Sequence, residues 1–165
     1  MSQLLEEILS KDNMTQAYKK VKANKGTCGA DGVGMDEIDD YLRKNWKTIK
    51  EEIRNRKYRP QPVRRVEIPK PNGGVRNLGI PTVADRIIEQ AIVQVLTPIV
   101  EPHFSEHSYG FRPGRRAQQA IVELLEYFKD GYTYIVDIDL EKFFDNVPQD
   151  KLCLLYTSPS PRDRG

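Results

Sequence analysis

Residues 64–81, RRVEIPKPNGGVRNLGIP, contain two short extended-favouring runs on either side of a Pro-Asn-Gly-Gly sequence. An Asn-Gly pair between two such runs is the strongest short-range signal for a β-hairpin. We therefore predict strands over residues 64–68 and 75–80, with Lys70 and Arg76 at the tip. An ammonium and a guanidinium placed there can both reach phosphate oxygens. The alternative interpretation of the same pattern is a charged hairpin that only faces solvent.

Helical patterns lie on both sides of this predicted hairpin. Four segments have apolar residues on one helical face: residues 3–9, 14–22, 35–57 and 121–128. Thr82-Val-Ala-Asp85 has the form of a helix-start box, and the apolar stripe that follows it is wide enough to bury a helix. Three glycines within residues 25–32 predict a loop.

Charge is distributed unevenly along the chain, although the net charge is only +2. Residues 41–76 hold 12 Lys and Arg against 3 Asp and Glu, whereas residues 121–150 hold 2 against 8. The first segment suits phosphate groups, and the second suits metal cations. The two cysteines form no Cys-X-X-Cys pair, so neither a disulfide framework nor a zinc ribbon is indicated. We expect a cytoplasmic protein without a membrane span, because no stretch approaches roughly 20 apolar residues.

An acidic and aromatic segment, YIVDIDLEKFFDNV, occupies residues 134–147. The β-branched and aromatic residues 132–138 predict a strand that ends in carboxylates. Nucleotidyl transfer needs rigidly presented carboxylates to hold two divalent ions. An acidic turn that merely closes a strand is the competing interpretation.

A third segment, FSEHSYGFRPGRR at residues 104–116, interleaves aromatic residues with arginine. Tyr109 and Phe111 can stack on bases while Arg112 grips phosphate. Equally, the segment can be a structural loop with both aromatic rings in the core. His103 and His107 are four residues apart but have no evident third ligand, so we expect no metal there.

In their order along the chain and in their residues, these three segments resemble the fingers and the first catalytic motif of group II intron reverse transcriptases. The resemblance implies an α/β architecture: reverse-transcriptase fingers made of helices and a hairpin, then the first palm strand, truncated there. It divides the chain into an N-terminal extension with helical fingers (1–60), fingers with the hairpin (61–130) and the start of the palm (131–152). Residues 153–165, CLLYTSPSPRDRG, resemble a read-through tail, and we predict that they are non-native.

The resemblance also implies roles near the predicted strand end. Asp139 stands five residues before Phe144, as the metal-binding aspartate of this family stands before its sugar-stacking aromatic residue. On this alignment Leu140 offers its carbonyl oxygen to the metal, and the Phe144 ring excludes ribonucleotides. Asp137 is the competing candidate for the metal-binding position.

Lys70 and Arg76, by the same resemblance, contact the incoming deoxynucleoside triphosphate. The glycine-containing loop at residues 26–32 is similar to the family's N-terminal insertion, which lies over the template and primer; its plainer interpretation is a helix connector. The expected template or RNA contacts are Arg64, Arg65, Tyr109, Phe111, Arg112, Gly29 and Asp31.

The implied activity is RNA-directed DNA synthesis with Mg²⁺ at a two-metal site, on an intron RNA template and a DNA primer, in intron mobility and splicing. No Tyr-X-Asp-Asp sequence, which supplies the family's other catalytic carboxylates, occurs in the 165 residues. We therefore expect this chain alone to be inactive. Alternatives are an RNA-binding fragment without catalysis, or a retron, diversity-generating or CRISPR-linked reverse transcriptase. The sequence leaves the oligomeric state open.

Overall fold

The computed structural model describes residues 3–71, 73–140, 143–148 and 150–151, with only the backbone at 144 and 145. The chain forms two compact units, Met1–Ser108 and Tyr109–Gly165. The divisions predicted after residues 60 and 130 stay predictions. In the first unit, the N-terminal helices share one core with the helix that follows the hairpin.

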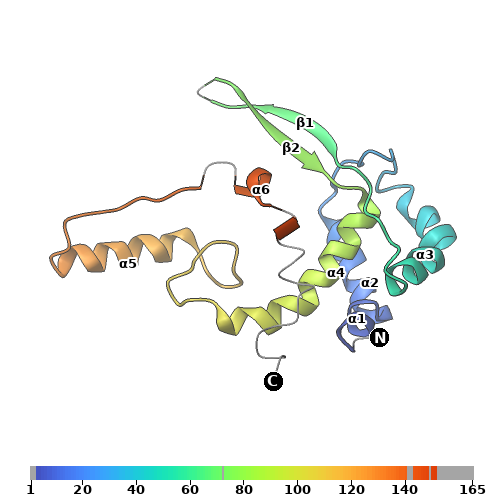
Figure 1. The fold of residues 1–165 in the computed structure, drawn as a ribbon, viewed down its shortest axis with the longest axis horizontal. Helices are drawn as coiled ribbons and strands as arrows, with labels where there is room; N and C mark the ends of the chain where they lie inside the picture. Colours follow the sequence, from blue (N-terminus) through green and yellow to red (C-terminus); the bar gives the residue numbers. More distant parts are fainter. Residues whose placement is uncertain (1–2, 72, 141–142, 149, 152–165) are drawn as a thin grey trace. The chain divides into compact units, whose positions relative to one another are not determined.

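The described residues of the first unit form four α-helices and a hairpin (Figure 1). The helices are α1 (Gln3–Ile8), α2 (Lys11–Ala23), α3 (Ile38–Arg54) and α4 (Val83–Val100), and a short 3₁₀ turn η1 (Glu101–His103) follows α4. All four were predicted. α3 is shorter than the predicted 35–57 because turns occupy residues 35–37 and because Arg56 has a φ of 57°, which a helix cannot accommodate.

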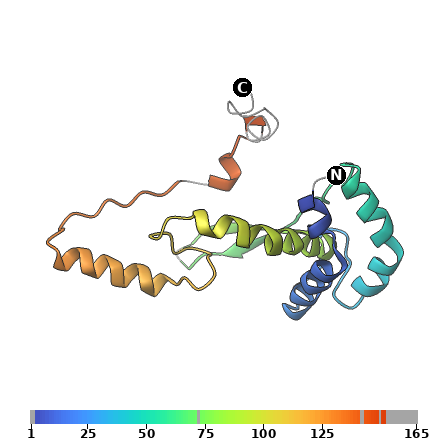
Figure 2. The ribbon, with the colours of Figure 1, turned by 90° about the horizontal axis from the view of Figure 1, so that it is seen from below.

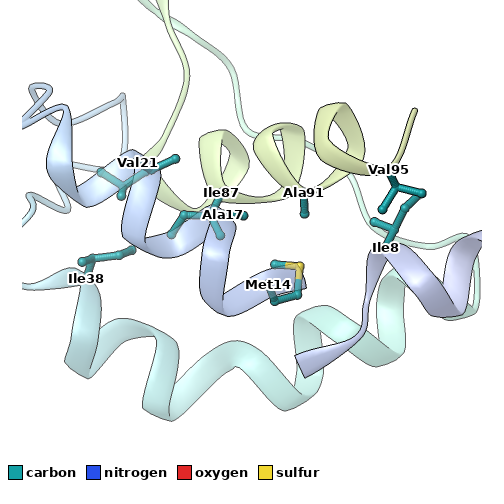
Figure 3. Close-up of a cluster of buried hydrophobic side chains, with 9 residues drawn as sticks. Ile8, Met14, Ala17, Val21, Ile38, Ile87, Ala91 and Val95 are labelled. Carbon is teal, nitrogen blue, oxygen red and sulfur yellow. The ribbon is translucent and has the colours of Figure 1, made fainter. Parts of the chain in front are cut away.

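The core of this unit lies on one face of α4, where α2 packs against it. Figure 2 shows α2 beside the green, N-terminal end of α4. Figure 3 shows Ala17 and Met14 of α2 facing Ile87 and Ala91 of α4. Ala17 and Ala91 are both fully buried, so small residues let the two helices approach closely. Ile38 brings the start of α3 into the same cluster.

Polar groups also join α2 to α4. The Asn13 side-chain amide donates to the Ala91 carbonyl oxygen at 3.0 Å and to the Ile8 carbonyl oxygen at 2.9 Å. Gln94 of α4 donates back to the Asn13 side-chain oxygen at 2.7 Å. One asparagine therefore holds α1, α2 and α4 together.

The hairpin consists of β1 (Arg64–Pro69) and β2 (Val75–Ile80), paired antiparallel as the sequence predicted. Ile68 pairs with Arg76 and Arg65 pairs with Gly79. Because successive side chains of a strand point to opposite faces, Arg76 and Arg65 lie on opposite faces of the hairpin. Most hairpin side chains are exposed, so little packing holds the hairpin in place.

The predicted helix start at Thr82 is confirmed. Thr82 is the N-cap of α4, and its hydroxyl oxygen accepts the Asp85 backbone N–H at 3.1 Å. The same hydroxyl donates to the Asp85 carboxylate at 2.7 Å. This reciprocal pair is buried and fixes where the chain turns from β2 into α4.

The second unit contains α5 (Ala117–Lys129), as predicted, and the short α6 (Phe143–Asn146). The prediction of a strand over residues 132–138 is wrong for this structure, which assigns no strand there. A strand needs a neighbouring backbone to complete its hydrogen bonds, and among the described residues no segment pairs with this one. Val136 and Ile138 are accordingly more than four-fifths exposed.

The helices of the described residues include none with the length and apolar character needed to cross a bilayer.

Candidate functional site

The tip of the hairpin presents two cationic side chains. The backbone N–H of Lys70 donates to the Gly74 carbonyl oxygen at 3.0 Å, which closes the turn, and Gly73 and Gly74 both have a φ of 84°. Such positive φ values suit glycine, so the two glycines allow the tight tip. Lys70 and Arg76 are exposed and make no hydrogen bond or ion pair with another described side chain. Both charges are therefore available to a ligand.

The arginine pair at the start of β1 is divided between two environments. Arg65 is exposed, whereas Arg64 is half-buried. The Arg64 guanidinium donates to the Thr27 hydroxyl oxygen at 2.9 Å and lies 3.8 Å from the Cys28 sulfur. Arg64 therefore holds the loop, and Arg65 faces outward.

The loop at residues 26–32 is anchored to the first turn of α4. Arg86 donates to the Thr27 carbonyl oxygen at 2.5 Å. Gly29 is buried, and a β-carbon at that position would lie 2.5 Å from the Thr82 Cα. Asp31 is exposed, and its carboxylate accepts the Val33 backbone N–H at 3.2 Å. The predicted RNA contact at Gly29 thus falls on a packing position, and Asp31 is the accessible member of the pair.

Sequence reasoning assigned no role to Arg86, although the loop depends on it. Thr27 and Arg86 are 59 residues apart, and no local pattern connects positions so distant. The one local signal is the position of the arginine directly after the helix-start box. From the first turn of a helix, a guanidinium can donate to the carbonyl oxygens of a neighbouring loop.

In the second unit, Tyr109 is tied to α5. Its hydroxyl hydrogen-bonds with the Glu123 carboxylate, which raises the pKa of Tyr109 above its usual value. The Arg115 guanidinium lies 5.5 Å from the centre of the Tyr109 ring, a cation–π distance. Phe111 is fully exposed and has a φ of 55°, and Arg112 is half-buried. Tyr109 is half-buried and bonded to α5, whereas the Phe111 ring is exposed. Template contact stays a prediction for both.

The carboxylates expected at the strand end are exposed, as is Leu140. Within the described ranges, no three His, Cys, Asp or Glu side chains are placed to hold one metal ion. Asp137 and Asp139 therefore do not make a complete metal site with the other described residues. The predicted role of Phe144 concerns a side chain outside the described part of the chain.

The profile of the family described as reverse transcriptase (RNA-dependent DNA polymerase) matches residues 68–162, more than half of the chain. The chain belongs to the reverse transcriptase family. The matched range includes the hairpin tip, the loop with Tyr109 and both candidate aspartates.

Two relatives show which kind of reverse transcriptase this chain is similar to. The group II intron-encoded protein LtrA of Lactococcus lactis subsp. cremoris is 35% identical over 147 residues, which cover 88% of this chain and 24% of LtrA. Protein YkfC of Escherichia coli (strain K12) is 34% identical over 153 residues, which cover 89% of this chain and 40% of YkfC. The chain thus spans 40% or less of the length of these two relatives. The resemblance to group II intron reverse transcriptases is confirmed.

A solved structure with the same fold is a chain of the partial Cas6-RT-Cas1--Cas2 complex. The match has a TM-score of 0.54 and 24% sequence identity. It covers 92% of the chain described here and 24% of the chain in the complex. The predicted fold class, reverse-transcriptase helices with an antiparallel hairpin, is confirmed.

Proposed function

We propose that this chain is the fingers part of an RNA-directed DNA polymerase encoded by a group II intron. The observation that carries the proposal is the pair Lys70 and Arg76 at the hairpin tip, which bond to no other described side chain and lie inside the range that the reverse transcriptase profile matches. The substrates would be an RNA template, a DNA primer and deoxynucleoside triphosphates.

Lys70 and Arg76 bind the triphosphate in this proposal. The ammonium supplies a compact charge, and the planar guanidinium can give two parallel hydrogen bonds to one phosphate. Gly73 and Gly74 let the turn fold tightly beside them, so the backbone does not block a phosphate group.

Asp139 is the proposed catalytic carboxylate and a Mg²⁺ ligand, with Leu140 adding its carbonyl oxygen. A bound Mg²⁺ would neutralise charge on phosphate oxygens during nucleotidyl transfer. The described residues alone do not complete a metal site. Phe144, five residues after Asp139, is proposed to exclude the ribose 2′-hydroxyl.

Each unit separately has exposed basic or aromatic side chains that form its own proposed RNA-facing surface. In the first unit, Arg65 on β1 and Lys44 and Lys47 on α3 are exposed. In the second unit, the exposed Phe111 ring is free to stack on a base. Arg64 and Gly29 contribute indirectly, because they fix the loop that carries Asp31.

Intron RNA is favoured as the template over a CRISPR-linked role. LtrA is 35% identical to this chain, whereas the reverse transcriptase of the Cas6-RT-Cas1--Cas2 complex is 24% identical. The identities support the group II intron assignment.

The test is primer extension by a chimeric enzyme that joins residues 1–151 of this chain to the remaining part of LtrA. We expect DNA synthesis on an RNA template with Mg²⁺. A well-folded chimera that binds RNA and primer but adds no nucleotide would contradict the proposed function.

A further inference from the structure

Asp85 on the first turn of α4 is one of the most deeply buried charged residues in the described chain, at 3% exposure. Its carboxylate accepts three hydrogen bonds. The donors are the Tyr58 hydroxyl at 2.6 Å, the Gln61 backbone N–H at 3.2 Å and the Thr82 hydroxyl at 2.7 Å. Both carboxylate oxygens are used, Oδ1 by Tyr58 and Oδ2 by the other two.

The three donors come from chain segments on both sides of the hairpin. Tyr58 and Gln61 precede β1, which begins at Arg64, and Thr82 follows β2, which ends at Ile80. One carboxylate therefore ties both ends of the hairpin to α4. The bond from Arg64 to Thr27 is an additional link, from β1 to the loop.

Hydrogen bonds matter more here than in a packed hairpin. Of the strand residues, only Arg64, Val66 and Ile80 are half-buried, and the others are exposed. Exposed strands gain little from apolar burial, so the direction in which the hairpin points depends on how its base is held.

A carboxylate suits this position because all three partners are donors. Asparagine keeps the size of the side chain but replaces one acceptor oxygen with an NH₂ group, which cannot accept a hydrogen bond. The NH₂ group would then face a hydroxyl that has to turn its own hydrogen away, and in a buried site that hydrogen loses its acceptor.

We propose that Asp85 is a positioning residue that holds the hairpin at a fixed angle to α4 and thereby sets where Lys70 and Arg76 stand. The effect on nucleotide binding rests on the proposed function, whereas the effect on the hairpin does not. The effect on nucleotide binding is measured by the affinity for dATP. The effect on the hairpin is measured by the distance from its tip to α4.

The distance is measured in the full 165-residue chain between two spin labels. One label is attached at Pro71→Cys beside the hairpin tip and the other at Val93→Cys, an exposed position of α4, after Cys28→Ser and Cys153→Ser. We expect a single narrow distance distribution with Asp85 and loss of that narrow peak in Asp85→Asn. An unchanged narrow peak in Asp85→Asn would overturn the proposal.

Asn13→Ala is the matched control for a general loss of stability. It removes part-buried hydrogen bonds between α2 and α4 without touching the base of the hairpin. We expect a lower unfolding temperature with the narrow distance retained. If Asp85→Asn does not fold, Tyr58→Phe removes one donor only, and its peak should be broader than that of Asn13→Ala; equal widths would overturn the proposal.

Titration with dATP separates this inference from the proposed function. Lys70→Ala and Asp85→Asn should both weaken dATP binding. If the peak broadens in Asp85→Asn but Lys70→Ala leaves the affinity unchanged, the positioning role stands and the proposed nucleotide site fails. If Lys70→Ala weakens binding while Asp85→Asn changes neither peak nor affinity, the positioning role fails.

Discussion

Gly29 lies so close to Thr82 that a β-carbon at position 29 would come within 2.5 Å of the Thr82 Cα. The obstacle is backbone at the N-cap of α4, so it cannot move aside as a flexible side chain would. We predict that Gly29→Ala destabilises the chain by about 1–3 kcal/mol, the usual cost of overpacking. Urea unfolding measures this change.

Gly34→Ala provides the control for Gly29→Ala. A β-carbon at Gly34 meets nothing within 4 Å, and this glycine has no positive φ. We expect its stability to stay within about 0.5 kcal/mol of the parent chain. Equal stabilities of the two variants would show that the loop is not packed against Thr82 in solution.

Arg76→Ala should weaken nucleotide use in the chimeric enzyme. Loss of a charge-assisted hydrogen bond predicts a rise in the apparent KM for deoxynucleotide of about tenfold. Steady-state primer extension at varied nucleotide concentration gives this value. Arg65→Ala, on the opposite face of the hairpin, should leave KM nearly unchanged; a similar KM increase in both variants would argue against a specific triphosphate contact.

Tyr58 predicts how stability depends on alkaline pH. Burial, and then its hydrogen bond to the Asp85 carboxylate, raise the pKa of Tyr58 above the ordinary value of 10.0. The folded state therefore retains the phenol proton longer than the unfolded state does. The resulting stabilisation is complete below about pH 10 and is lost as the pH rises towards the folded-state pKa.

Unfolding free energies measured from pH 7 to beyond pH 10 test this expectation. In Tyr58→Phe the fall at high pH should be shallower, because one perturbed group no longer titrates. Tyr109 and Tyr127 also have raised pKa values and remain in the variant. Identical curves for the parent and Tyr58→Phe would place the Tyr58 hydroxyl in solvent.

RNA binding by the 165-residue chain should depend strongly on salt. Phosphate contacts release counterions, so the logarithm of the affinity falls linearly with the logarithm of the salt concentration. Replacing the exposed Lys44 and Lys47 with Gln should lower the slope by about 0.7 per lost contact for single-stranded RNA. Fluorescence anisotropy at several salt concentrations measures it, and slopes that match the parent chain would remove α3 from the RNA-facing surface.

Local patterns predicted much of the fold. The hairpin, the four N-terminal helices and α5 each follow from turn chemistry, capping or apolar periodicity within a short segment. The strand at 132–138 has an equally clear pattern but did not form, because strand pairing depends on a second segment that the pattern does not supply.

In the candidate site, too, local patterns predict some residues, whereas contacts between distant positions could not be predicted. Lys70 and Arg76 were located from the turn between them. The tie from Arg86 to Thr27 and the bonds from Tyr58 and Gln61 to Asp85 join positions 24 or more residues apart, so only the folded chain reveals them. Arg64 and Arg65 are neighbours in sequence with similar chemistry, and burial alone gives them different roles.

The most direct test of the reverse transcriptase assignment compares Asp139→Asn with Asp137→Asn in the chimeric enzyme, by primer extension on an RNA template with Mg²⁺. Loss of a metal-binding carboxylate removes several kcal/mol of transition-state stabilisation, so Asp139→Asn should show no detectable extension. Asp137→Asn should retain extension, since both aspartates are exposed and only Asp139 stands five residues before Phe144. Normal extension by Asp139→Asn with none by Asp137→Asn would contradict the assignment of the catalytic aspartate, and normal extension by both would contradict a catalytic role for this segment.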